Sequence, residues 1–427
     1  MPSVLDSSPA TIRCSKCGTE FSQNADRCPG CGRVVSTGSS QMVLAATLLL
    51  IIAGFALTQY LVNVHRDTES SLAARWFTRG EQAMQAHLPA AAADCYRTAL
   101  SYDPGNQQYR LHLAQALLAD NRLAEARAHL SSLWEEEPAD GEVNLTLARL
   151  YVRRRDYSKA VRYYSNAING VWSEEPRARR IATGFELANF LLQHHNLAQA
   201  QAELVAIQAD GPSDPADQLL LGNLLLQVKE PQRAIQAFDV VLQREPDNAQ
   251  AWLGKAQASL VLGDYKEAEH AISLAVERDS KLEEARQQLE VVREVLRLDP
   301  ALRGLSVAER SRRVAEAFEL AMTRINGCAT QQGIPLVDPP SSAAQSSGTT
   351  VSVSSPAADE LQSFYNAGMQ KQASASEKAL RKNPDALEPT MQFVFDVEKA
   401  LASICPATDK SNRALLLLAQ HEGEAVK

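Results

Sequence analysis

The chain is poor in aromatic residues and has no excess of positive charge. Only 6% of its 427 residues are aromatic while 45% are hydrophobic, which suits helices rich in Ala and Leu better than sheets. The formal net charge is −8 and the pI is near 5.6. A general nucleic-acid-binding protein presents a basic face, so we expect no nucleic-acid partner.

Catalytic motifs are also missing. The sequence contains no Walker-type glycine loop, dinucleotide fingerprint, HExxH helix or nucleophile elbow. His194 and His195 are adjacent where a turn between two helices is expected, and such a pair is usually solvated. We therefore expect no enzymatic activity and no small-molecule substrate. An active site in the C-terminal segment is the rival hypothesis, but no paired Cys/His, Ser/His or carboxylate pattern supports it there.

The sequence does contain a repeat. Six alanines recur at nearly constant spacing, with successive steps of 34, 34, 40, 34 and 34: Ala92, Ala126, Ala160, Ala200, Ala234 and Ala268. A small residue lies twelve positions before each: Gly80, Ala114, Ala148, Ala188, Gly222 and Ala256. A large apolar one lies four positions after each: Tyr96, Leu130, Tyr164, Leu204, Phe238 and Ile272. A proline closes four of the six units. This pattern predicts a stack of helical hairpins.

The hairpin pattern resembles the tetratricopeptide repeat. Small residues let two antiparallel helices approach closely, and the large residue fills the groove between them. The resemblance covers residues 73–282 in six units, and the first carries Trp76 and Gly80 at signature positions. It implies an all-α fold, a solenoid of helical hairpins. We expect the six extra residues of the longer step, around 175–180, to lengthen a turn.

In this family the first helices of successive hairpins line a concave groove. The position after each small residue faces that groove and is polar in all six units: Glu81, Gln115, Arg149, Asn189, Asn223 and Gln257. The resemblance implies that these side chains hold partner proteins or extended peptide segments. Asn189 and Asn223 are the strongest candidates, because an amide satisfies both groups of a peptide unit. A solvated helix face is the alternative. A clamp for a terminal carboxylate is not expected, because Phe185 and Leu219 replace its lysines.

Four of the seven cysteines lie close to the N-terminus. Cys14 and Cys17 form one C-x2-C pair, and Cys28 and Cys31 form another a short distance later. Four thiolates suit a tetrahedral zinc ion, and the segment 12–34 resembles a zinc ribbon. Because all four ligands come from the protein, we expect a structural Zn²⁺. Two disulfides or free thiols are the alternative.

One long apolar segment follows. Residues 42–62 carry no charge, and 21 residues of helix span ~32 Å, enough to cross a bilayer. We expect a single transmembrane helix in contact with lipid. Basic residues on its two sides nearly balance, so they do not fix the orientation. Since thiols stay reduced in the cytoplasm, we expect the ribbon there and the repeats in the periplasm, with the anchor in a bacterial inner membrane.

The remainder of the chain predicts further helices. We expect helices that cap the solenoid at 283–327, one of them opened by Ser306 and Glu309 and ending just before Gly327. We also expect a Ser/Pro-rich linker at 335–357 and a segment of three short helices at 358–427. We expect an apolar stripe to face the stack, in a solvating helix that ends it: Leu282, Ala285, Leu289, Val292 and Leu296. Cys328 and Cys405 flank the linker, and outside the cytoplasm they would tend to pair.

These features together predict a membrane-anchored scaffold. Its repeat groove would dock partner proteins during the assembly, secretion or maturation of other envelope proteins. The alternative is a signalling adaptor in which the ribbon reports groove occupancy across the membrane.

Overall fold

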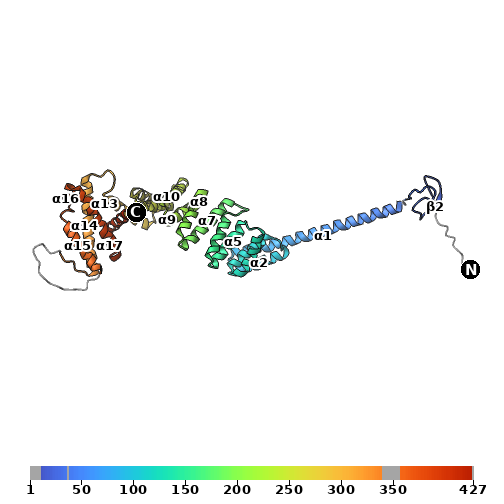
Figure 1. Cartoon of the computed structure of the whole chain (residues 1–427), viewed down its shortest axis with the longest axis horizontal. Helices are drawn as coiled ribbons and strands as arrows, with labels where there is room; N and C mark the ends of the chain where they lie inside the picture. Colours follow the sequence, from blue (N-terminus) through green and yellow to red (C-terminus); the bar gives the residue numbers. More distant parts are fainter. Residues whose placement is uncertain (1–10, 36–37, 339–355, 426–427) are drawn as a thin grey trace. The chain divides into compact units, whose positions relative to one another are not determined.

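The computed structural model describes residues 11–35, 38–338 and 356–425 (Figure 1). The chain divides into two compact units, residues 1–160 and residues 161–427. Apart from one short hairpin of strands, the regular structure of the described ranges is helical. This confirms the predicted all-α class.

The first unit begins with a small hairpin. Strands β1 (Thr11–Arg13) and β2 (Glu20–Ser22) are antiparallel, and Ile12 lies opposite Phe21. Phe21 is buried together with Cys14 and Cys28, and few other apolar side chains pack against them. A core this small cannot stabilise a fold by hydrophobic burial alone.

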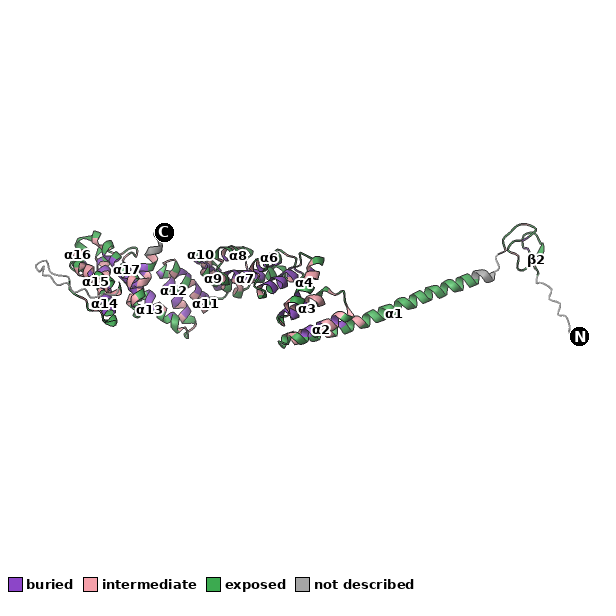
Figure 2. Cartoon of the chain, turned by 60° about the horizontal axis from the view of Figure 1, so that its bottom comes forward, coloured by how far each residue is buried: buried purple, intermediate pink, exposed green. Residues whose placement is uncertain are grey.

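The apolar segment and the first helix of repeat one form a single helix. Helix α1 (Gly38–Gln85) has 48 residues, and it contains one stretch long and apolar enough to span a membrane. The side chains of 42–62 are exposed, as the green part of α1 in Figure 2 shows. Ala73 is the first fully buried residue of α1, so packing against the repeats begins there.

Helical hairpins follow one another along both units. In the first unit they are α2 (Pro89–Tyr102), α3 (Gln107–Ala119), α4 (Leu123–Glu136) and α5 (Gly141–Arg153). Helix α6 (Tyr157–Ile168) contains the boundary between the units. In the second unit they are α7 (Pro176–Gln193), α8 (Leu197–Asp210), α9 (Pro215–Gln227), α10 (Pro231–Arg244), α11 (Ala249–Val261) and α12 (Tyr265–Arg278). Sequential helices within each unit pack against each other.

The predicted small and large residues pack as expected. All six repeat alanines are fully buried. A Cβ atom on Gly80 would lie 2.4 Å from the Tyr96 ring, and one on Gly222 would lie 2.5 Å from the Phe238 ring. These two positions therefore admit only glycine beside an aromatic side chain, which explains why two of the six small residues are not alanine.

The longer step between Ala160 and Ala200 is built differently from the prediction. The extra residues do not form a longer turn at 175–180, because α7 already begins at Pro176 and has 18 residues, whereas α9 and α11 have 13. Most of the insertion extends the N-terminal end of a helix. Proline is favoured in the first helical turn, where its missing N–H needs no partner.

Beyond repeat six the second unit continues as a helical bundle. It contains α13 (Glu283–Leu298), α14 (Val307–Gln332), α15 (Pro356–Lys371), α16 (Glu377–Lys382), a 3₁₀ turn (Pro384–Ala386), α17 (Leu387–Ile404) and α18 (Lys410–Ala425). Ser306 caps α14 by accepting a hydrogen bond from the Glu309 N–H, as predicted. Helix α14 packs against α15, α16, α17 and α18, and α13 packs against both α12 and α18.

Three expectations for this region are corrected. Most of the apolar stripe of α13 is buried and α13 packs against α12 as predicted, but α13 does not end the stack in solvent, because α18 packs against it. Helix α14 does not stop before Gly327 but continues to Gln332, where Gly333 in the left-handed region ends it. The C-terminal segment has four α-helices instead of three. Most of the predicted linker, residues 339–355, lies outside the described residues.

Candidate metal centre and partner-binding surface

The four N-terminal cysteines lie on two turns of the same design. The Gly18 N–H donates to the Cys14 carbonyl, and the Gly32 N–H donates to the Cys28 carbonyl, both at 2.9 Å. Both glycines have positive φ, 75° and 68°, which a residue with a side chain rarely adopts. Each turn brings its two cysteine side chains to the same side, as a zinc knuckle requires.

The sulfur atoms form a compact group. All four lie within 4.8 Å of one another. Cys14 Sγ is 3.6 Å from Cys31 Sγ, and Cys17 Sγ is 3.4 Å from Cys28 Sγ. A tetrahedral zinc site with Zn–S bonds of about 2.3 Å places its sulfurs about 3.8 Å apart. The group therefore fits such an ion after small adjustments, and no disulfide joins any of these cysteines.

Hydrogen bonds from neighbouring residues lower the pKa of two of these thiols. Those of Lys16 and Cys17 lower the pKa of Cys14. The hydroxyl of Thr19, followed by its N–H, lowers the pKa of Cys17 to about 6. The N–H of Arg33 acts in the same direction on Cys31, but the proton shared with Cys17 and burial raise the pKa of Cys31 to about 11. A bound cation would favour thiolates at all four positions.

Two of the three predicted groove positions in the first unit are charged. Glu81 on α1 and Gln115 on α3 are half-buried, and Arg149 on α5 is exposed. Gln115 donates a hydrogen bond of 3.3 Å to Glu142 at the start of α5, so this amide is already engaged. Burial lowers the pKa of the neighbouring His112, while Glu81 and Glu142 oppose that change.

The corresponding positions of the second unit are uncharged. Asn189 on α7 is half-buried, and Asn223 on α9 and Gln257 on α11 are exposed. Each amide lies between two apolar residues of the same helix face, four positions before it and three after it. These apolar residues are Phe185, Leu192, Leu219, Leu226, Leu253 and Leu260, and none is exposed. We call the apolar, amide and apolar residues on one helix the row of that helix. Helices α9 and α11 contact each other, so their two rows lie side by side.

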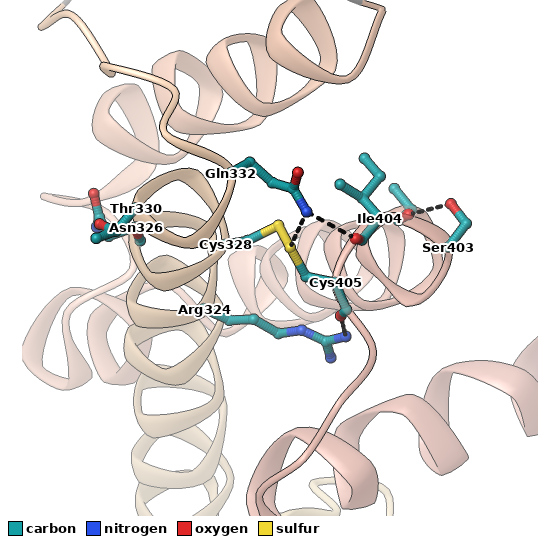
Figure 3. Close-up of a disulfide and its surroundings, with 9 residues drawn as sticks. Arg324, Asn326, Cys328, Thr330, Gln332, Ser403, Ile404 and Cys405 are labelled. Carbon is teal, nitrogen blue, oxygen red and sulfur yellow. Dashed lines mark hydrogen bonds between the residues drawn. A yellow bond between two sulfur atoms is a disulfide. The ribbon is translucent and has the colours of Figure 1, made fainter.

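A disulfide joins Cys328 on α14 to Cys405 at the end of α17 (Figure 3). Their Cα atoms are 5.8 Å apart, and the two residues are 77 positions apart in sequence. Arg324 donates to the Cys405 carbonyl at 3.1 Å and also pairs with Glu398 of α17. Both charged side chains are buried. The bridge and the ion pair hold the same two helices together.

Two features of the structure were not predicted from the sequence. The pairing of Arg324 with Glu398 joins residues far apart in sequence, and no local pattern signals it. The turn within each hairpin contains a residue of positive φ at the same repeat position: His87, Asn121, Arg155, His195, Lys229 and Gly263. Their regular spacing was visible, but of the six only Gly263 and Asn121 are of types that commonly signal this conformation.

Comparison with known protein families supports the repeats. One tetratricopeptide repeat model matches residues 83–150 and 117–170, and a second matches residues 185–244 and 219–283. These matches cover parts of both units. They contain five of the six predicted groove positions, all except Glu81.

Curated relatives match part of the chain. The chain is 28% identical over 183 residues to "Putative cellulose synthase operon protein C" of Escherichia coli O157:H7, covering 41% of this chain. It is also 28% identical over 176 residues to the Salmonella typhimurium "Cellulose synthase operon protein C", covering 40% of this chain. The chain spans only 15% and 14% of the length of these two relatives.

Two solved structures of low sequence identity match part of this chain. Pseudomonas aeruginosa pilF has 18% identity and a TM-score of 0.38, covering 52% of this chain and 98% of that one. YrrB, described as a TPR protein with an unusual peptide-binding site, has 15% identity and a TM-score of 0.36, covering 46% and 98%. The family matches and the helical hairpins together identify the central part of this chain as an all-α tetratricopeptide repeat solenoid.

Proposed function

We propose that this protein is a membrane-anchored scaffold that docks other proteins on the first helices of its repeats. The observation that carries this proposal is the set of amides on successive first helices of the second unit, which we call the amide row: Asn189, Asn223 and Gln257. Asn223 and Gln257 are exposed between apolar residues, and no described residue hydrogen-bonds to the Asn223 side chain. A solenoid presents such rows as an extended surface for protein or peptide partners.

The apolar part of α1 would serve as the anchor. Its side chains at 42–62 are exposed along the whole stretch, which is costly in water and favourable in lipid. Because α1 continues without a break from this stretch to Gln85, the anchor would connect directly to repeat one. The ribbon would lie on the cytoplasmic side, and the repeats would lie in the periplasm of a bacterium.

The four-cysteine group would hold one structural zinc ion. Cys14, Cys17, Cys28 and Cys31 would supply its four ligands, leaving no open position for a substrate. A scaffold of this kind has no catalytic role, and we propose none.

A role in assembling envelope components is consistent with the relatives from cellulose synthase operons. We propose that the partners are proteins of envelope assembly, secretion or maturation. The second candidate is a signalling adaptor, favoured by the continuity of α1 between the membrane stretch and repeat one. A strain without residues 12–34 that keeps full function would exclude the adaptor.

The scaffold proposal is tested by crosslinking in native membranes. The full-length protein is crosslinked, purified under denaturing conditions, and compared with a variant carrying Asn189→Ala and Asn223→Ala. We expect specific partner proteins whose recovery falls in the variant. Recovery of the same proteins from both would show that the amide row does not dock them.

A further inference from the structure

Helix α13 follows α9 and α11 at the next repeat position, and the C-terminal helix α18 packs against it. One repeat period beyond Gln257 and Leu260 of α11 lie Val291 and Glu294 of α13. On α11 Gln257 is exposed, whereas Val291 and Glu294 are only 3% and 7% exposed. Helix α13 thus stands where the first helix of a seventh repeat would lie. Its row is covered at Val291 and Glu294, whereas Gln287, the equivalent of Leu253, is exposed.

The covering element is α18. Ser411 of α18 donates a hydrogen bond of 2.6 Å to Glu294, and Lys410 lies 3.7 Å from Glu290. Tyr265 at the start of α12 donates to the Leu417 carbonyl at 3.3 Å. Ala414, Leu415, Leu418 and Ala419 of α18 are buried. The chain therefore places an amphipathic helix of its own on the row of α13.

The rows next to α18 remain open. We define the open strip as six residues of α9 and α11: Leu219, Asn223, Leu226, Leu253, Gln257 and Leu260. None is charged, and Val261 beside it is 53% exposed. At the end of the strip lies a hollow of about 350 Å³. Its apolar lining includes Leu260 of α11, Val291 of α13, and Leu416 and Leu417 of α18, and its polar lining is Gln288, Arg413 and Gln420. The strip and the surface of α18 meet at this hollow.

We propose that the open strip binds an amphipathic α-helix of the partner, which ends against α18 and places an apolar side chain in the hollow. This inference rests on the proposed docking function and names the class of its ligand. A helix is the occupant because α18 is a helix and covers the equivalent row of α13. The strip offers no charged group, so an ionised side chain facing it would lose hydration without gaining a partner. The partner's contacting face therefore carries apolar and amide or hydroxyl residues.

Site-specific photo-crosslinking in the full-length membrane protein tests this proposal. A photoreactive residue is placed at Gln257, at Glu81 in the first unit, and at Gln243, an exposed residue of α10. We expect crosslinks at Gln257 and none at Gln243. Sequencing the crosslinked partner segment is expected to show apolar residues at helical spacing and no charged residue on that face.

The possible outcomes separate this inference from the docking function. A crosslinked segment with charged contact residues or an extended β pattern overturns the helix proposal, and so does capture of lipid or of a second copy of this chain. Crosslinks at Glu81 without any at Gln257 leave docking intact and remove the open strip from it. Absence of protein crosslinks at both positions contradicts the docking function itself.

A charge introduced into the strip gives an independent measurement. Gln257→Lys should lower the crosslink yield from a photoreactive residue at Asn223 at least tenfold, because the new ammonium would have to be buried under the partner. Gln243→Lys adds the same charge on α10 and should leave the yield unchanged. Equal yields from the two variants would show that no apolar helix covers Gln257. The helical content of both variants, measured by circular dichroism, checks that the loss in Gln257→Lys does not come from unfolding.

Discussion

The turn within each hairpin places one residue in the left-handed region of backbone conformation. In repeats one to five this residue is not glycine, and Lys229 has φ of 62°. In this conformation a residue with a Cβ atom has a steric energy about 1–2 kcal/mol higher than glycine. Glycine loses more conformational entropy on folding, which offsets part of this difference. We expect Lys229→Gly to raise the free energy of unfolding by up to about 1 kcal/mol. Urea unfolding measures it, with Lys229→Ala as the control that should give no gain. A less stable Lys229→Gly variant would contradict this reading.

The cysteine group makes a prediction about metal content. Replacing Cys28 by serine removes a buried ligand, so the zinc content of the purified full-length protein should fall from about one ion per chain to nearly none. Elemental analysis measures this. Cys95→Ser on α2 is the matched control, because Cys95 lies outside the group and should not change the zinc content. Zinc retained after Cys28→Ser, or absent from the wild-type protein, would exclude the proposed site.

At the scale of elements, α18 depends on the carboxylate of Glu294. Hydrogen bonds from Arg297 and then from Ser411 lower the pKa of Glu294 to about 2, although burial opposes them. The ordinary value is 4.5. Because the folded-state pKa is the lower one, this carboxylate stabilises the fold above pH 4.5, and its contribution is lost as the pH falls toward 2.

Glu294→Gln should therefore be less stable than the wild type at neutral pH, and the difference should shrink as the pH falls from 4.5 toward 2. Chemical unfolding at neutral pH and near the acid end of this range measures it. Glu290→Gln is the control on the same helix, because Glu290 is exposed and exposed ion pairs contribute little. A difference that persists unchanged in acid would show that the charge of Glu294 does not hold α18 in place.

The disulfide links two helices of the bundle that are far apart in sequence. Closing a loop of this length contributes roughly 4 kcal/mol in the chain-entropy model. We expect Cys405→Ser to lower the stability of the bundle by up to that amount, and we expect non-reducing mass mapping of the wild-type protein to find Cys328 linked to Cys405. Free thiols at both positions, alkylated only by membrane-permeant reagents, would instead place the repeats in the cytoplasm.

The sequence predicts the repeat helices well because their signals are local. The alanines, the small residues and the closing prolines each lie within one hairpin, and all recur. The bundle after α12 was predicted less well, because its contacts join residues far apart in sequence. Nothing near Arg324 indicates Glu398, and nothing near α13 indicates that α18 covers it. The extra residues at the N-terminal end of α7 were predicted as a turn, although Pro176 is equally compatible with the start of a helix.

The same distinction applies to the candidate sites. The two C-x2-C pairs predict all four cysteines whose sulfur atoms lie together in the structure, since each pair lies on a local turn. The repeat period predicts the six groove positions, because each follows a small residue directly. It does not predict which side chains contact them. Only the structure shows that Gln115 donates a hydrogen bond to Glu142 and that Leu260, at the end of the strip on α11, meets α18.

At the scale of the whole molecule, three parts of the chain would have separate roles. The apolar stretch of α1 would hold the protein in the membrane, the ribbon would fold around zinc on one side, and the repeats would dock partners on the other. The C-terminal bundle would then limit the docking surface, because α18 leaves the rows of α9 and α11 open and closes that of α13.

The most direct test of this account is the affinity of a partner, once identified by crosslinking, for the variant with Asn189→Ala and Asn223→Ala. Two lost amide contacts should weaken binding about ten- to a hundredfold, since a hydrogen bond contributes roughly 0.5–1.5 kcal/mol. The melting temperature should stay nearly unchanged, as it should for Asn326→Ala, an exposed amide on α14 that should not affect binding. Unchanged affinity, or a large fall in melting temperature, would contradict a docking role for the amide row.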